Sequence, residues 1–368
     1  MMNRQNQKGG DGSTNIQAEQ MIVHVGIDEK RAREIYQEMN LQIRSDYTQE
    51  ALSAANARVA EFEEKLMPKM AEVEGALQAF ADPAFQILLV EAQKTAASTE
   101  RQEDYDLLSE LLIHRFKKGE NRIARAGISL AVGIVDKISD EALLGLTVAH
   151  AISSFSPTSG DIYNGLDDLN NLFESLIYGK LPNGSDWLDH LDILNAVRLS
   201  TIGSLKKIQD YYPTLLSGYV DAGIEKESQN HVKAVEILKE NNIPLGILVN
   251  HTLSDRHVRL EVASRAMISR ITMHTTITAH GRTFQIPLKL TEKQEQALNH
   301  IYDLYSQDGN QKKINNNLIM ENWDKRSSLK IIKDWWNSIP FAFNITSAGK
   351  VLAHSNAQRC NKILPPLD

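Results

Sequence analysis

The sequence predicts a mainly α-helical protein: a multi-helix bundle with a short N-terminal β-strand and a C-terminal mixed, winged-helix-like module. Three observations support this fold class. Helix-forming residues are plentiful, while aromatic residues make up only 6% of the chain. Apolar residues recur at the spacing of a helix face over most of the length. The stretches that favour strands instead are short and few.

The first two elements lie in residues 1–26 and 27–82. Residues 1–15 are mostly polar and small, so residues 1–26 are expected to form a flexible leader followed by a strand, which ends before Gly26. Residues 27–82 have apolar residues at helical spacing and a Pro at position 68. They are therefore expected to form an acidic helical hairpin whose second helix is kinked or ended by Pro68.

The middle of the chain is expected to be helical throughout. Residues 83–180 favour a bundle of antiparallel helices, because a capping residue or a breaker bounds each short helical stretch. Pro and Gly near residues 181–185 mark a boundary. Residues 181–270 are expected to form a second helical region.

Residues 271–368 are expected to form a mixed α/β module. Residues 271–290 are rich in Thr and Ile around a central Gly, which favours a β-hairpin or an irregular insertion. A helix follows from Thr291, a second helix leads to Trp336, and a short strand, FAFNI, precedes a helix capped by Thr346. This order of elements resembles that of a winged-helix module.

Length, charge and cysteine content limit the classes of protein that fit. With 368 residues and a formal charge of -7, the chain is long enough for several domains and is not built throughout to neutralise phosphates. Its single cysteine, Cys360, excludes an intrachain disulfide and a cysteine-based zinc cage, so a cytoplasmic location is expected. No apolar stretch reaches the roughly 20 residues that a membrane span needs.

The β-prone leader is the most distinctive local feature. Stacked copies of such a segment can pair their backbone and amide groups along a ladder, and a single copy can add a strand to a partner. The residues expected to make these assembly contacts are Ile16, Gln17, Ile22 and Val23. Alternatively, the strand completes an edge of the protein's own fold or joins no sheet.

Four segments carry a resemblance to a known family: GGDGSTNIQAEQMIV, GIDEKRAREIYQEMN, FQILLVEAQKTAASTERQEDYDLLSELLIHRF and ITSAGKVLAHSNAQR. Together they resemble an uncharacterised bacterial helical family associated with anti-phage defence loci. The resemblance implies a role in defence. The Asn-Ile-Gln-Ala run at residues 15–18 is also similar to bacterial amyloid-signalling segments, although Glu19 stands where such segments commonly have glycine.

Catalytic and cofactor motifs are missing from the sequence. GxSxG, GxxxxGK[ST], HExxH and a GxGxxG that follows a strand are all absent, so neither a cofactor nor a metal is expected and an enzyme is disfavoured. Asp186 and His190 share a face at a helix start, where helix capping is favoured over metal binding. An enzyme would require a site assembled in residues 247–280, with His257 or His274 near a carboxylate.

These features favour a non-enzymatic interaction protein that associates with itself as a homo-oligomer or with another protein. The alternative is a nucleic-acid-binding regulator that uses the locally basic C-terminal part of the chain. Its candidate contacts are Lys325, Arg326, Lys330 and Lys333. Neighbouring tryptophans would then stack on bases, whereas in the simpler interpretation they fill a core.

Overall fold

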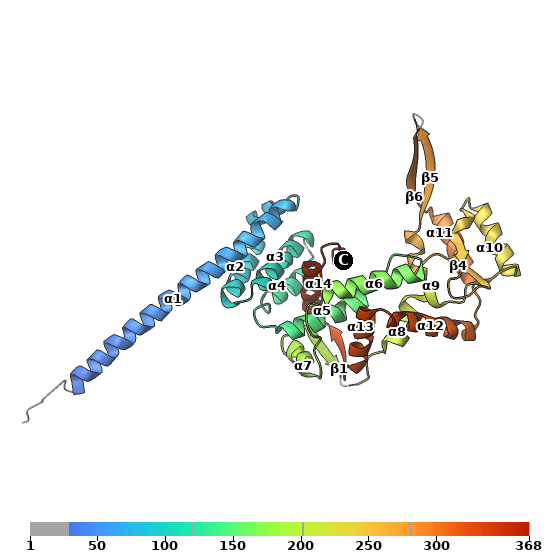
Figure 1. Cartoon of the computed structure of the whole chain (residues 1–368). Coiled ribbons are helices and arrows are strands. Elements are labelled where there is room, and N and C mark those ends of the chain that lie inside the picture. The colour runs from blue at the N-terminus through green and yellow to red at the C-terminus, as the bar shows by residue number, and fades with distance from the viewer. Residues whose placement is uncertain (1–28, 120, 201, 280–281, 368) are drawn as a thin grey trace, which may run out of the picture. The chain divides into compact units, whose positions relative to one another are not determined.

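The computed structural model describes residues 29–119, 121–200, 202–279 and 282–367 (Figure 1). Helices dominate these residues, and the strands that they contain are short and lie in small sheets. The predicted mainly α fold class is therefore confirmed. The predicted leader and its strand in residues 1–26 lie outside the described residues.

Helix α1 is one continuous helix of 44 residues, Glu29–Glu72. The hairpin expected within residues 27–82 is therefore wrong. No glycine stands between residues 27 and 74 to turn the chain, and Pro68 is tolerated inside the last turns of the helix. The chain turns after the helix, at Gly75, whose φ of 76° is easily reached only by glycine.

The chain divides into two compact units, residues 1–57 and 58–368. After α1, the second unit continues with a run of helices joined by short connections, as expected for residues 83–180. Their starts coincide with capping side chains: Asp82, Asn121, Ser139 and Asp161 each accept a hydrogen bond from a backbone N–H of the helix that follows. The elements are the 3-10 helix η1 (Ala76–Ala81), α2 (Pro83–Ser98), α3 (Gln102–Lys117), α4 (Arg122–Val132), α5 (Asp140–Ser154) and α6 (Ile162–Leu176).

Residues 181–270 contain helices and, unexpectedly, short strands. The strands β2, β4 and β3 form an antiparallel sheet in that order. Two to four residues per strand are too few to show an alternating pattern, which is why the sequence did not indicate them. The elements are α7 (Asp186–Ile193), β1 (Val197–Ser200), α8 (Ile208–Leu215), α9 (Ser217–Val220), β2 (Ile224–Glu225), α10 (Gln229–Glu240), η2 (Leu245–Ile247), β3 (Leu248–Asn250), β4 (His257–Leu260) and η3 (Arg265–Arg270).

The C-terminal elements appear in the predicted order. The β-hairpin is confirmed, because β5 (Thr272–Ala279) pairs antiparallel with β6 (Arg282–Lys289). Thr291 and Gln294 form a capping box at the start of the next helix. The remaining elements are α11 (Glu292–Asp303), α12 (Gly309–Asp324), α13 (Ser327–Ser338), β7 (Ala342–Ile345) and α14 (Ser347–Cys360).

These C-terminal elements contribute to two different hydrophobic cores and do not pack as a separate module. Helix α14 packs against α3, α4 and α5, and β7 pairs with β1. Both therefore belong to the larger core, which also holds Phe62 and Leu66 of α1. Helix α11 instead packs in a second core with α10, β4 and η3.

In the part of the chain that the structure describes, no helix combines the length and the apolarity needed to cross a lipid bilayer.

Candidate functional site

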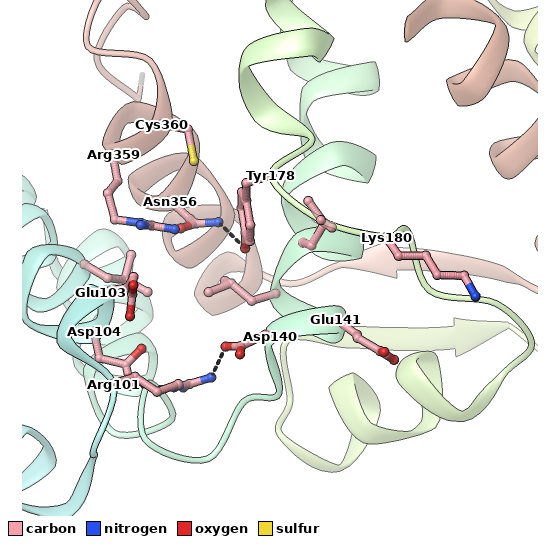
Figure 2. A pocket seen from close by; sticks show the side chains of 14 residues that line it. Arg101, Glu103, Asp104, Asp140, Glu141, Tyr178, Lys180, Asn356, Arg359 and Cys360 are labelled. Atoms are coloured by element: carbon pink, nitrogen blue, oxygen red, sulfur yellow. Dashed lines mark hydrogen bonds and ion pairs between the residues drawn. The ribbon is translucent and has the colours of Figure 1, made fainter.

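A cavity of about 590 Å³ opens beside the last turn of α14 (Figure 2). We call it the α14 cavity. The starts of α3 and α5 and the chain that follows α6 complete its walls. The lining residues are Arg101, Glu103, Asp104, Leu107, Asp140, Glu141, Leu143, Leu144, Tyr178, Gly179, Lys180, Asn356, Arg359 and Cys360.

One wall of the cavity is a structural ion-pair cluster around Arg101. Its Nε lies 3.0 Å from Asp104 Oδ2 and its Nη1 lies 2.5 Å from Asp140 Oδ1. The same guanidinium donates to the carbonyl oxygens of Ile138 at 2.8 Å and Val135 at 2.7 Å. Burial acts to lower the pKa of Arg101, but Asp104 and Asp140 outweigh it and the pKa is raised. Arg101 thus stays charged, and its ion pairs and hydrogen bonds join the start of α3 to the start of α5.

The opposite wall is organised by Asn356, which is fully buried in α14. Its amide nitrogen donates to Thr147 Oγ1 at 2.9 Å and to the Tyr178 hydroxyl at 3.3 Å. Its amide oxygen accepts from Arg359 Nε at 2.9 Å. The Arg359 guanidinium also lies over the Tyr178 ring, 5.5 Å from its centroid. One buried amide therefore orients both a cation and a hydroxyl that line the cavity.

The electrostatics of this wall favour binding over nucleophilic chemistry. Burial raises the pKa of the Tyr178 hydroxyl, which therefore remains a proton donor at neutral pH. Burial also raises the pKa of the Cys360 thiol. A protonated thiol is a weak nucleophile, so Cys360 is not activated for catalysis. The cavity offers fixed donors, carboxylates and an apolar surface formed by Leu107, Leu143 and Leu144.

A second polar cluster, three histidines, lies inside the larger core and joins three helices. His150 Nε2 is 3.3 Å from His354 Nδ1, and the rings of His114 and His354 are 5.8 Å apart. His114 also contacts Ser355 Oγ at 3.0 Å and Gln358 Oε1 at 2.8 Å. Burial lowers the pKa of His114 and of His150 to about 4, so both are neutral at pH 7. Sequence reasoning missed this cluster because its members are far apart along the chain.

The four basic residues predicted to contact nucleic acid lie at the end of α12 and along α13. Three of them are in ion pairs: Arg326 with Asp167, Lys330 with Asp334, and Lys333 with Asp324. Lys325 lies 3.4 Å from Asn322 Oδ1 and is exposed. The nearby Trp323, Trp335 and Trp336 are buried and donate their indole N–H groups to backbone carbonyls, so they fill the core.

The other predicted site residues are placed as follows. Ile16, Gln17, Ile22 and Val23 lie outside the described residues. His190 lies in the last turn of α7, and its Nε2 accepts a hydrogen bond from the backbone N–H of Ser139, the residue before α5, at 3.2 Å; no side chain caps the start of α7. His251 contacts the backbone oxygen of Asp221, and His257 contacts Ser254 Oγ. The side chains of His274 and His280 are not among those that the structure describes. Among the described residues no group of three or more histidines, cysteines or acids is placed to hold a metal.

Comparison with known proteins places the chain in a protein family. The model of an uncharacterised protein family matches residues 26–365, which include every element from α1 to α14 and all residues of the α14 cavity. No curated protein and no solved structure matches the chain. Because the match covers nearly the full length, the chain belongs to this uncharacterised family.

Proposed function

We propose that the protein is a non-enzymatic interaction protein that assembles with a second copy of itself through the first part of α1. The supporting observation is a set of large apolar side chains that stay exposed on residues 29–57. Tyr36 is 69% exposed, Met39 58% and Tyr47 68%. Exposed apolar surface of this kind marks interaction sites.

The three side chains share one face of the helix. Separations of three residues from Tyr36 to Met39 and eight from Met39 to Tyr47 keep them within one stripe of a helix with 3.6 residues per turn. The core-facing residues Phe62 and Leu66 belong to the later part of α1 and are buried. A helix that buries no face is only marginally stable in water, so the exposed stripe favours a partner helix.

The charges along this stretch favour a second copy in antiparallel orientation. Residues 30–33 include three basic side chains, whereas residues 46–50 include two acidic ones. Placing Tyr36 of one copy opposite Tyr47 of its partner sets Arg33 of each copy opposite Glu50 of the other. Parallel pairing would place like charges side by side, at a cost.

A role in bacterial anti-phage defence is part of the proposal, and its support is the resemblance of residues 9–40, 85–116 and 345–359 to a defence-associated family. The strand expected from the sequence at residues 16–25, which lies outside the described residues, would extend the same contact. Nucleic-acid binding through α12 and α13 has less support, because three of its four predicted cations are already paired with acids.

The test is the mass of the full chain in solution, measured by sedimentation velocity over a range of protein concentrations. We expect a dimer or larger oligomer for the wild type and a monomer for the double variant Tyr36→Glu/Tyr47→Glu, because buried unpaired carboxylates oppose association. The matched control is Ser45→Glu/Gln49→Glu, which adds the same charge to the opposite helix face and should assemble like the wild type.

A monomeric wild type, or a Tyr36→Glu/Tyr47→Glu variant that assembles unchanged, would contradict the proposal. Deletion of residues 1–25 separates the two candidate contacts. Loss of assembly on that deletion, with no effect of the α1 variant, would assign the contact to the leader instead.

A further inference from the structure

The α14 cavity contains charged groups that the fold itself does not use. Among the described residues, none forms a hydrogen bond or an ion pair with the carboxylate of Glu103 or of Glu141, with the Lys180 ammonium, or with the terminal Nη atoms of Arg359, whose guanidinium lies over the Tyr178 ring. Figure 2 shows all four side chains among those that line the cavity. Four ionic groups therefore remain available to a ligand.

The balance of these charges selects a class of ligand. Arg101 is paired with both Asp104 and Asp140, so this cluster offers no cation to a ligand and carries one net negative charge. The remaining groups are two cations, Arg359 and Lys180, and two anions, Glu103 and Glu141. A polyanion such as a polyphosphate would meet two repelling carboxylates, and a polyamine would meet two repelling cations. A ligand that carries one charge of each sign is complementary to this lining.

The apolar part of the cavity narrows the class further. Leu107, Leu143 and Leu144 line it and are at most 5% exposed, so the surrounding packing holds them in place as a rigid apolar surface. The cavity volume of about 590 Å³ lies within the usual range for small-molecule sites and accommodates a ligand larger than a single residue. A charged ligand with an apolar side chain would use both parts of the lining.

We propose that the α14 cavity binds a zwitterionic ligand of the amino-acid type, either a free apolar α-amino acid or a short apolar peptide with free termini. Its carboxylate contacts the Arg359 guanidinium and the Tyr178 hydroxyl. Its ammonium group contacts Glu103 or Glu141, and its side chain lies on the leucines. An arginine suits the carboxylate because its two terminal nitrogens bind both oxygens at once.

The hydrogen bonds of Asn356 support this assignment because they order the binding groups in advance. Asn356 is fully buried and holds Arg359 Nε at 2.9 Å and the Tyr178 hydroxyl at 3.3 Å. Side chains that are already fixed lose little entropy when the ligand binds. Tyr178 is nevertheless 46% exposed, so a ligand can reach it.

The proposal is tested by isothermal titration calorimetry on the full chain with L-leucine and the dipeptide leucyl-leucine as probes. We expect saturable binding of at least one. Leucinamide, which lacks the carboxylate, and 4-methylpentanoate, which lacks the amine, should bind at least about tenfold more weakly, because each loses a charge-assisted hydrogen bond. Inorganic phosphate should not compete.

Three variants locate the site. Arg359→Gln should weaken probe binding at least about tenfold, and Arg359→Lys should restore only part of it because lysine lacks the bidentate geometry. Glu103→Gln/Glu141→Gln removes both acceptors for the ammonium group and should weaken binding similarly. The control is Lys313→Gln, which removes an exposed cation far along the chain on α12 and should bind the probes like the wild type. Thermal melting of each variant establishes that it is folded.

Three results would overturn the proposal: no heat with either probe, tight binding of 4-methylpentanoate or phosphate without an amine, or unchanged affinity in a folded Arg359→Gln variant. The oligomer measured for the α1 variants is independent of this titration. A monomeric protein that binds leucine would contradict the proposed function. It would still support the ligand proposed for the α14 cavity.

Discussion

At the scale of single residues, the buried histidines show how the core of this protein tolerates polar groups. His114, His150 and His354 come from α3, α5 and α14 and satisfy their ring nitrogens with one another or with nearby hydroxyl, amide and carbonyl groups. Ring nitrogens that are paired in this way are stable only while the rings stay neutral, because a buried imidazolium would lose its hydration. The packing of α14 therefore depends on the protonation state of these rings.

This dependence predicts a loss of stability in acid. The pKa of His114 and of His150 is about 4 in the folded protein and about 6.5 when unfolded. Between these values the unfolded chain binds more protons, so the free energy of unfolding is fully retained above pH 6.5 and falls as the pH drops toward 4. The full effect is about 3 kcal/mol for each histidine.

Urea unfolding at pH 7 and pH 5 measures the effect. Acidification should lower the free energy of unfolding of the wild type, and His150→Leu should reduce that dependence because one of the titrating rings is gone. An equal dependence on pH in the wild type and in His150→Leu would show that other groups control the acid sensitivity.

At the scale of elements, α14 depends on a close backbone approach at its first turn. Thr346 caps the helix and also donates through its hydroxyl to the carbonyl oxygens of Asn195 and Ala196, just before β1. A Cβ added at Gly349 would overlap the carbonyl oxygen of Ala196. Glycine is therefore required at this position by its small size, since its φ is ordinary.

We accordingly expect Gly349→Ala to destabilise the fold by a few kcal/mol, in the manner of overpacked cores, where the cost is about 1–3 kcal/mol or more. Gly309, in the first turn of α12, is the matched control because a Cβ there meets nothing within 4 Å. Gly309→Ala should leave the melting temperature unchanged or raise it slightly. Equal melting temperatures for the two variants would show that the turn before β1 can move aside.

Element boundaries show which signals the sequence contains. Ser139, Thr291 and Thr346 were recognisable as caps, because capping is a contact between neighbours in the chain. The pairing of Val197 with Ile345 joins positions far apart in the chain and has no local pattern. The α14 cavity was missed for the same reason: Arg101, Tyr178 and Arg359 become neighbours only when the start of α3, the chain that follows α6 and the end of α14 pack together.

At the scale of the whole described chain, residues 216–224 pass from the larger core to the second one. Leu216 and Val220 are buried in the larger core, and Ile224 is buried in the second. Asp221 lies between them. It accepts a hydrogen bond from the Tyr302 hydroxyl at 2.7 Å and forms an ion pair with Lys312 at 2.6 Å. One carboxylate thus connects α11 of the second core to α12, which packs in the larger core.

This connection predicts that Asp221 keeps the two cores unfolding together. Asp221→Ala leaves the Tyr302 hydroxyl and Lys312 without their carboxylate, so the second core should open more readily than the larger one. Hydrogen exchange measured by mass spectrometry should show faster exchange in α10 and α11 of the variant, with little change in α3 and α5. Asp303→Ala, which removes an exposed ion pair with Arg265, is the control and should change exchange little. Uniform acceleration across both cores would mean that Asp221 stabilises the fold as a whole and does not couple its two parts.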